Sequence, residues 1–327
     1  MTNFWKNKNI LVTGAGGFIG SNAVHYFDGL GANITAIVSP STPEKKLLIN
    51  LGSKLQKIKV TRANLLDRKV VEKITKNQDV ILHFAAIDGN TSFKKNHSAD
   101  ILSQNTRINL NLIESSVKNN VGDFLLVSSA DLYSAKESTL SENSPIDISW
   151  KHPVDGYKLA KWFFELASNE FAKQYNHKTI VIRPGNIYGP RDEFTNVERM
   201  RFIPSVIHKI SSGEPITLWG SGKQTRSFLY VDDFLNICKE LLQEKIYNQP
   251  INIASDNHIS LQDLIEEISK ESGKKANITI DVSTFSGAES RILDTTKLKS
   301  LIKLGKEISL SEGLKKTILF YKKNYSK

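Results

Sequence analysis

Three side chains in the middle of this sequence have the types and the spacing that proton transfer needs. Tyr157 and Lys161 belong to the segment YKLAK, and their four-residue spacing places both on one face of a helix. A free phenol titrates at about 10, and a neighbouring ammonium lowers that pKa toward neutrality. Ser129, in LLVSSADLY, ends an apolar run upstream and offers a hydroxyl beside the phenol. The set predicts an acid-base centre in which Tyr157 exchanges the proton.

Glycines at intervals of three residues predict a phosphate-binding turn near the N-terminus. The segment TGAGGFIGS places Gly14, Gly17 and Gly20 directly after an apolar run and at the start of a helical segment. Gly14 permits a tight turn, Gly17 lets the backbone approach a pyrophosphate, and Gly20 lets the helix pack closely on the strand. The spacing is G-x-x-G-x-x-G, whereas the standard fingerprint is G-x-G-x-x-G. In this strand-turn-helix context the segment predicts dinucleotide binding.

The end of the second predicted strand favours NADP(H) over NAD(H). An acid at this place would accept hydrogen bonds from the adenosine ribose and would repel a 2′-phosphate. Ser39 stands there instead, and Lys45 and Lys46 follow it. We therefore expect NADP(H), with NAD(H) as the alternative in which Ser39 makes one weaker hydrogen bond. Asn64 ends the third predicted strand, where its amide can face the adenine edge.

Composition and charge exclude several classes of protein. The 327 residues carry a formal net charge of +10, but the basic residues are scattered along the chain, so we expect no nucleic-acid partner. The single cysteine, Cys238, excludes an intramolecular disulfide and a multi-cysteine metal site, and we expect no metal. Apolar runs are too short to cross a bilayer and no signal-peptide pattern is present, so we expect a cytoplasmic protein without a membrane partner.

Apolar runs of strand length alternate with helical segments and predict how these side chains are positioned. The predicted strands are residues 9–13, 33–38, 55–60, 79–84, 123–128 and 179–183. This alternation is typical of an α/β fold with a doubly wound parallel (Rossmann) sheet, buried on both faces. We expect a dinucleotide-binding domain of residues 1–185, to which residues 225–258 return. The remaining residues, 186–224 and 259–327, are expected to form a smaller α/β substrate-binding region.

Five motifs in this order resemble those of the extended short-chain dehydrogenase/reductase family, the NAD(P)-dependent epimerases and dehydratases of nucleotide-linked sugars. They are TGAGGFIG, HFAA, VSSADLY, YKLAK and RPGNIYGP, and the resemblance covers essentially the whole chain. It implies that Tyr157 is the general acid/base, that Lys161 holds the nicotinamide ribose, and that Ser129 hydrogen-bonds the reacting hydroxyl or carbonyl. It also implies cofactor contacts from further residues of the first and second motifs, namely Phe18, Ile19 and Ala85.

The same resemblance implies that a nucleotide diphosphate sugar binds to the C-terminal part of the chain. Arginine suits a diphosphate because its planar fork matches two phosphate oxygens. The implied substrate-binding residues are Asn186, Arg191, Arg226 and Arg291. The family also implies a homodimer, formed by helices around residues 99–119 and 156–176.

Within this family the motifs are most similar to those of GDP-fucose synthase, with two departures. Asp131 stands where that enzyme has an epimerising cysteine, and Arg191 stands where it has an epimerising histidine. The specific 3,5-epimerase chemistry therefore does not transfer, but the Asp131 carboxylate can shuttle a proton at a ring carbon beside a ketone.

Three functions remain as alternatives. The first is an NADP(H)-dependent reductase of the C4 ketone of a nucleotide-linked deoxysugar, of the kind used for surface polysaccharides, with epimerisation as an added ability. The second is an epimerase or 4,6-dehydratase that retains NAD; it would need no added cofactor, whereas a reductase consumes NADPH. The third is a non-catalytic cofactor-sensing or nucleic-acid-binding protein on the same fold.

Overall fold

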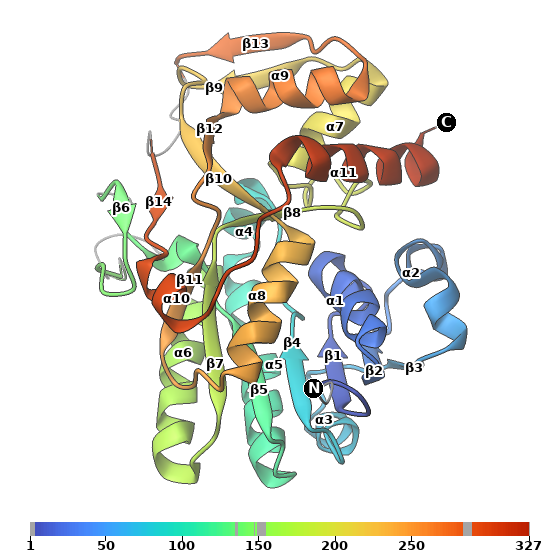
Figure 1. Cartoon of the computed structure of the whole chain (residues 1–327), viewed down its shortest axis with the longest axis vertical. Coiled ribbons are helices and arrows are strands. Elements are labelled where there is room, and N and C mark those ends of the chain that lie inside the picture. Colours follow the sequence, from blue (N-terminus) through green and yellow to red (C-terminus); the bar gives the residue numbers. More distant parts are fainter. Residues whose placement is uncertain (1–3, 135–136, 147, 149–154, 284–289, 327) are drawn as a thin grey trace.

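A seven-stranded parallel sheet forms the centre of the protein (Figure 1). The computed structural model describes residues 4–134, 137–146, 148, 155–283 and 290–326. The strand order is β11-β7-β5-β4-β1-β2-β3, and each neighbouring pair is parallel. The strands progress outward in both directions from β1, as in a doubly wound, Rossmann-like sheet. The predicted α/β fold class is confirmed.

Five of the seven sheet strands lie close to the ranges predicted from the sequence, β3 differs, and no strand was predicted at β11. The strands are β1 (Asn9–Thr13), β2 (Asn33–Val38), β3 (Lys59–Arg62), β4 (Val80–His83), β5 (Asp123–Val127), β7 (Thr179–Pro184) and β11 (Pro250–Ile253). The helices are α1 (Phe18–Gly29), α2 (Glu44–Leu51), α3 (Arg68–Ile74), α4 (Thr91–Asn96), α5 (Ser98–Lys118), α6 (Gly156–Tyr175) and α8 (Val231–Gln243).

The predicted strand at residues 55–60 is wrong in its first half. Residues Gly52–Gln56 form a 3-10 helix, and β3 begins only at Lys59. Gly52 has a φ of 53°, a left-handed conformation that ends α2 and lets the chain tighten into the 3-10 turn. Because β3 is an edge strand that pairs only with β2, its pairing begins where the register with Thr35 starts, at Lys59.

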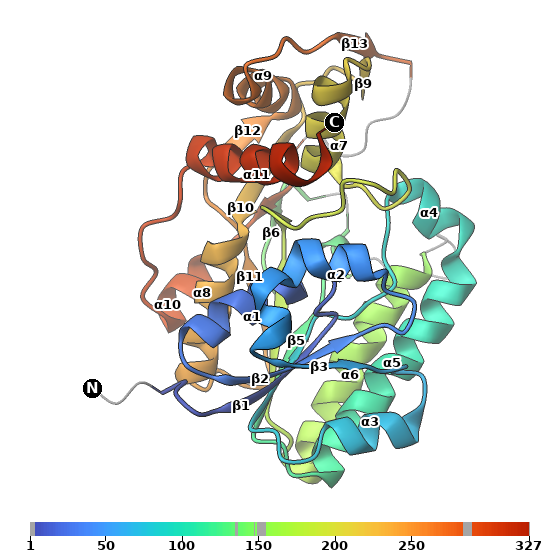
Figure 2. The same ribbon diagram turned by 90° about the vertical axis from the view of Figure 1, so that its right-hand side faces the viewer.

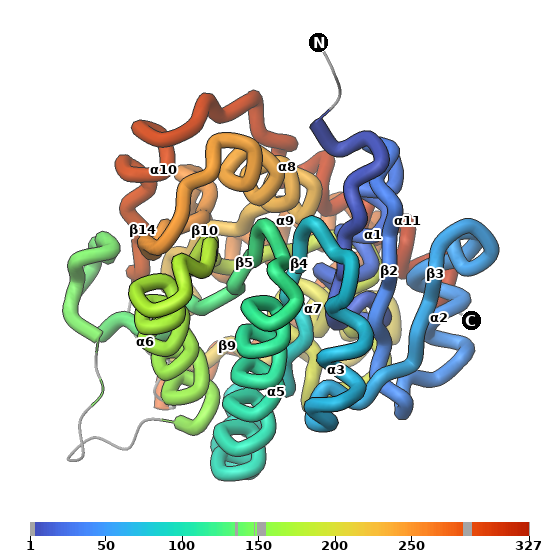
Figure 3. Tube along the Cα trace, turned by 90° about the horizontal axis from the view of Figure 1, so that it is seen from below, coloured from blue at the N-terminus to red at the C-terminus, as the bar shows by residue number. Residues whose placement is uncertain are grey.

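Helices cover both faces of the sheet (Figure 3). In β1 successive side chains alternate between two buried clusters, because Ile10 and Val12 belong to one cluster and Leu11 to the other. Side chains of α1 and α8 contribute to the first cluster, and those of α3, α5 and α6 to the second. The sheet is thus buried on both faces, as its continuous apolar runs predict. Among the described residues, none of the helices combines the length and the apolar character needed to cross a membrane.

A smaller region lies above the carboxyl ends of the sheet strands (Figures 1 and 2). It contains a three-stranded sheet of β8 (Asn186–Tyr188), β10 (Thr225–Tyr230) and β12 (His258–Ser260). Two-stranded sheets pair β9 (Ile216–Trp219) with β13 (Ile278–Asp281) and β6 (Thr139–Leu140) with β14 (Ile292–Leu293). The helices are α7 (Phe202–Ser212), α9 (Leu261–Ser272), α10 (Thr296–Leu301) and α11 (Leu310–Tyr325).

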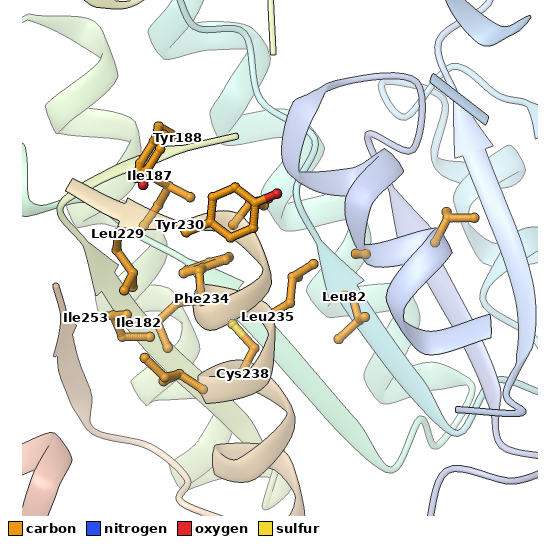
Figure 4. Packing of buried hydrophobic residues seen from close by; sticks show 14 of the residues in the cluster. Leu82, Ile182, Ile187, Tyr188, Leu229, Tyr230, Phe234, Leu235, Cys238 and Ile253 are labelled. Atoms are coloured by element: carbon orange, nitrogen blue, oxygen red, sulfur yellow. The ribbon is translucent and has the colours of Figure 1, made fainter. Parts of the chain in front are cut away.

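One continuous core joins the two parts of the chain (Figure 4). Phe234 and Cys238 of α8 are fully buried in it, together with Ile182 of β7 and Tyr230 of β10. Residues 225–230 therefore pair with the smaller region, while residues 250–253 return to the edge of the large sheet. The exact domain boundaries stay a prediction.

Candidate active site

A cleft of about 330 Å³ opens between the carboxyl ends of the sheet strands and the smaller region. Most of the residues predicted to act on substrate line it. The predicted residues on its wall are Ile19, from the predicted cofactor contacts, and Ser129, Asp131, Tyr157, Asn186, Arg226 and Arg291. Charged residues that the sequence motifs do not single out line it as well, namely Asp88, Lys94, Asp192 and Arg201.

The glycine turn after β1 fits a bound pyrophosphate. Gly17 caps α1 without a side-chain hydrogen bond, and the first turn holds no acid, so the N-terminal amides are available to an anion. Gly14 has a φ of 68°, and a Cβ there would lie 2.8 Å from the backbone nitrogen of Ala85. A Cβ on Gly20 would overlap the Gly14 carbonyl oxygen. The tight turn therefore depends on glycine at both positions.

Arg62 lies near Ser39, although no sequence motif predicts an arginine there. Arg62 ends β3 directly beside Val38, and its Nη1 donates to the carbonyl oxygens of Pro40 at 3.1 Å and Thr42 at 2.8 Å. Its Nη2 pairs with Glu44. The only signal in the sequence is an arginine two residues before Asn64, and the register between β2 and β3 decides that it reaches the β2 end.

The other residues predicted at the adenosine end have local partners or point outward. Lys46 pairs with Glu193 at 2.5 Å, and Lys45 is exposed. Asn64 is exposed, and its Oδ1 accepts from the Leu66 nitrogen at 3.1 Å, which closes its own turn. Of these basic side chains, Arg62 is thus the one whose guanidinium contacts the loop after β2.

The Tyr157 phenol is held at the start of α6. Asp155 accepts from the Lys158 nitrogen and caps the helix, while the Gly156 nitrogen donates to the Ser98 hydroxyl at 2.7 Å. A Cβ on Gly156 would overlap the Ser98 carbonyl oxygen, so only glycine lets α6 approach α5 this closely. Tyr157 is 8% exposed, and the nearby Ser129 side chain lowers its pKa.

Lys161 is not among the main influences on the Tyr157 pKa in this structure, and its role as the acidifying cation stays a prediction. Burial raises the pKa of Tyr157 above its usual range, the Asp88 carboxylate raises it further, and the Lys94 ammonium is the cation that lowers it. The Lys161 Nζ lies 5.5 Å from the ring centroid and donates instead to the Val127 carbonyl at 2.6 Å. Burial lowers the pKa of Lys161 itself to about 8. The four-residue spacing places Tyr157 and Lys161 on one face of α6, but the Lys161 ammonium binds the Val127 carbonyl at the end of β5.

Asp131 lies between two cations at the wall of the cleft. The Lys94 Nζ is 3.4 Å from one carboxylate oxygen, and the Arg291 Nη1 is 3.6 Å from the other. Burial raises the pKa of Asp131, but Lys94 and then Arg291 outweigh it and hold the carboxyl below its usual range. The two cations therefore favour the carboxylate form of Asp131, which can accept a proton.

Three guanidinium groups face the same cleft from the smaller region. Arg226 donates to the Thr225 carbonyl at 2.8 Å, and burial followed by the charge of Arg291 lowers its pKa. Arg201 pairs with the buried carboxylate of Asp192 at 2.8 Å. This concentration of positive charge makes the wall a favourable place for a diphosphate.

Two further predicted residues differ in their placement. The Asn186 side chain lines the cleft while its Nδ2 donates to the Ser227 carbonyl at 3.0 Å. Arg191 is not among the residues that line the cleft: its Nε donates to the Asn50 carbonyl at 3.0 Å and its Nη1 to the Asn22 Oδ1 at 2.8 Å. Arg191 therefore ties α1 to α2, and its backbone is left-handed, with a φ of 69°.

Comparison with known proteins places this geometry in a family context. Residues 10–254 match the NAD dependent epimerase/dehydratase family. A dTDP-4-dehydro-6-deoxy-D-allose reductase of a Streptomyces species is 33% identical over 97% of both chains. GDP-L-fucose synthase 1 of Arabidopsis thaliana is 27% identical over 75% of this chain and 77% of that protein. The UDP-glucuronic acid 4-epimerase of Bacillus cereus, solved with UDP-glucuronic acid and NAD, is 25% identical, with a TM-score of 0.82 over 97% of this chain and 100% of that one.

An acid placed at the cap of α1 tests the dinucleotide turn. A Cβ on Gly17 meets only the Gly14 oxygen at 3.3 Å, and the extended backbone there suits a capping side chain. We expect Gly17→Asp to fold with unchanged thermal stability but to bind NADPH at least about tenfold more weakly, because its carboxylate repels the pyrophosphate. Fluorescence titration measures the Kd. Gly17→Asn is the neutral control, and equal affinities of the two variants would contradict the assignment.

Proposed function

Because the chain belongs to the NAD dependent epimerase/dehydratase family, we propose that it reduces the C4 ketone of a nucleotide-linked 6-deoxysugar with NADPH. The observation that carries this proposal is the likeness, over 97% of both chains, to reductases of a dTDP-4-dehydro-6-deoxysugar. The cleft supports it, because Asp131 is its carboxylate next to Ser129 and is held ionised. The residue before Asp131, Ala130, offers no second carboxylate beside Ser129 for water elimination, so a dehydratase is a poorer match.

Tyr157 and Ser129 are proposed to act on the ketone oxygen. The dinucleotide supplies the hydride when it is bound. Ser129 donates a hydrogen bond to the ketone oxygen, and Tyr157 gives that oxygen its proton as negative charge develops there. Both side chains line the same cleft, and Ser129 is near enough to lower the pKa of Tyr157, so one oxygen atom is proposed to contact both. Lys161, anchored on Val127, is proposed to hold the nicotinamide ribose.

The arginine wall is proposed to bind the diphosphate of the substrate. Arg226 and Arg291 offer bidentate donors from two separate segments, and Arg201 adds a third guanidinium. Asn186 is proposed to contribute a polar contact at the same wall. The likeness to dTDP-sugar reductases makes dTDP the nucleotide to test first.

NADP(H) is proposed as the cofactor because the β2 end combines the absence of an acid with a nearby guanidinium. Ser39 presents a hydroxyl instead of a carboxylate and is hydrogen-bonded to Ser41 at 2.9 Å. Arg62 contacts the carbonyls of the same loop. A guanidinium in this place attracts a 2′-phosphate and makes charge-assisted hydrogen bonds to it.

Asp131 is proposed as a base for an additional epimerising step. An ionised carboxylate beside the cleft can remove a proton from a ring carbon that a neighbouring ketone activates. This ability is tested by running the reduction in D2O and analysing the sugar product by mass spectrometry and NMR. Deuterium at a ring carbon beside C4, lost in Asp131→Asn, would support the base; its absence in the unaltered protein would leave simple reduction.

A homodimer is proposed through the outer face of α5 and α6. An apolar groove of about 520 Å³ lies between these helices, and Phe163 and Leu166 beside it are 40% and 48% exposed. The same face on a second copy would bury these side chains in a two-fold interface. The groove is lined by Leu102, Ser103, Thr106, Arg107, Leu159, Trp162, Phe163 and Leu166.

The proposed reaction is tested by adding a dTDP-4-keto-6-deoxysugar and following NADPH at 340 nm. We expect oxidation of NADPH and expect Tyr157→Phe to lower kcat by a factor of about 10² to 10⁴, because the proton donor is lost. Tyr175→Phe, which changes an exposed tyrosine of the same helix, is the matched control. If no keto-sugar oxidises NADPH but a nucleotide hexose is isomerised without added cofactor, a 4-epimerase replaces the proposed reductase.

Removal of the Arg62 guanidinium tests the cofactor preference. We expect Arg62→Met to raise the KM for NADPH about tenfold and to leave the KM for NADH unchanged, because only NADPH carries the 2′-phosphate. Arg68→Met is the control, since Arg68 is 61% exposed and pairs with Glu72 on α3. A parallel rise in both KM values would instead indicate that Arg62 only braces the loop.

A charge in the α5/α6 groove tests the dimer. We expect Leu166→Glu to halve the molar mass measured by light scattering, because it buries a carboxylate in the apolar interface. Leu319→Glu on α11, whose parent side chain is 69% exposed, is expected to leave the mass of the protein unchanged. A monomeric unaltered protein would refute the interface outright.

A further inference from the structure

Two lysine ammonium groups of the described residues lie near the Tyr157 ring, and that of Lys94 is the nearer one. Its Nζ lies 3.9 Å from the ring centroid, whereas the Lys161 Nζ is 5.5 Å away. Lys94 comes from α4, a short helix that stands between the sheet and the smaller region at the upper end of α5 (Figure 2). A cation over an aromatic face is attracted to the ring and more strongly to a phenolate.

Two carboxylates hold this ammonium in place. The Lys94 Nζ is 3.1 Å from an Asp88 oxygen and 3.4 Å from an Asp131 oxygen, and its side chain is 15% exposed. Burial lowers the pKa of Lys94, but Asp131 and Asp88 outweigh it, so the ammonium stays charged. Because two carboxylates already fix the Lys94 side chain, it loses little further rotamer freedom when a ligand binds.

The two lysines near Tyr157 differ in their partners, because Lys94 contacts carboxylates and Lys161 contacts a backbone carbonyl. Lys161 is engaged by the Val127 carbonyl, and burial lowers its pKa to about 8. Asp131 and Asp88 instead raise the pKa of Lys94, which favours its charged form. Support for a negative Tyr157 oxygen therefore has a source outside the YKLAK segment.

We propose that Lys94 is a positioning residue for the reduction proposed above, in which its ammonium, anchored by Asp88 and Asp131, stabilises the Tyr157 phenolate. In that reaction hydride adds to C4, the phenol proton passes to the C4 oxygen, and Tyr157 is left as a phenolate. Lys94 touches neither reacting atom and acts through the ring. The expected effect on the reaction rate rests on the proposed function, whereas the expected effect on the ionisation of Tyr157 does not.

Every charged group around the ring enters the expected pH dependence. Asp88, from the segment after β4, and Asp131, after β5, oppose ionisation of the phenol, whereas Lys94 favours it. Lys161 lies on the same helix as Tyr157. Removing Lys94 takes away the favourable charge and leaves both carboxylates, so the pKa of Tyr157 must rise. An opposite charge at this distance is worth about one to three pH units.

The expected change in each rate follows from the protonation state of Tyr157 that reduction and oxidation require. Reduction needs the protonated phenol and slows as the pH rises through the pKa of Tyr157. Oxidation of the product alcohol needs the phenolate and accelerates through the same pKa. In Lys94→Met both limbs are therefore expected to move to higher pH by about one unit, and oxidation at neutral pH to slow about tenfold.

Ionisation of the ring can be measured without any sugar. Protein labelled with ¹³Cζ-tyrosine and saturated with the oxidised dinucleotide is titrated by NMR up to pH 10.5, and Tyr157→Phe identifies the signal. The positive charge of the oxidised nicotinamide opposes the effect of burial, so we expect the midpoint of Tyr157 to lie below 10.5 in the unaltered protein and about one unit higher, or beyond the range, in Lys94→Met. Lys94→Arg keeps the charge and is expected to stay within a few tenths of a unit of the parent.

The neighbouring Lys95 provides the matched control. It is exposed on the same helix, so Lys95→Met is expected to leave both pH profiles and the NMR midpoint unchanged. The proposal is overturned if Tyr157 does not titrate below pH 10.5 in the parent, or if the Lys94→Met and Lys95→Met curves superimpose. If the parent reduces no keto-sugar, the proposed function fails while the NMR titration still decides the role of Lys94.

Discussion

Parallel pairing of the seven-stranded sheet is the constraint on which the rest of this structure depends. All of its strands end at one edge, so side chains that follow different strands are brought together there. The residues that the sequence motifs single out just after successive strands are Gly14, Ser39, Asn64, Ala85, Ser129 and Asn186. The smaller region closes over this edge and supplies the arginines, so the cleft brings acid-base side chains from the sheet edge together with guanidinium groups from the smaller region.

Charge balance inside the cleft decides what its acid-base groups can do. Asp131 stays ionised because Lys94 and Arg291 flank it, and Lys94 stays charged because Asp88 and Asp131 flank it. The buried Tyr157 phenol therefore lies beside a network with both signs of charge rather than beside one cation. Such a network suits a reaction that moves one proton to one oxygen, because each ionised group already has its partner.

Patterns that repeat at a fixed spacing predicted most of the fold. The strand from Asn9 to Thr13 and the helix from Gly156 to Tyr175 were recognisable because burial on both faces or helical periodicity is written into neighbouring residues. The range 55–60 was harder, because an edge strand buries little, and the left-handed Gly52 redirected the chain. Arg191 was misplaced for a related reason: a motif position gives the location of the backbone but not the direction of the side chain.

The sequence by itself determined the family, the order of the elements and the identity of the Ser129, Tyr157 and Lys161 set, because those follow from residue type and local spacing. Only the tertiary structure decided that Lys94 rather than Lys161 lies against the Tyr157 ring and that Arg62 reaches the end of β2. The physical reason is that distances between segments depend on strand register and helix packing. Neither quantity is encoded in the spacing of the residues along one segment.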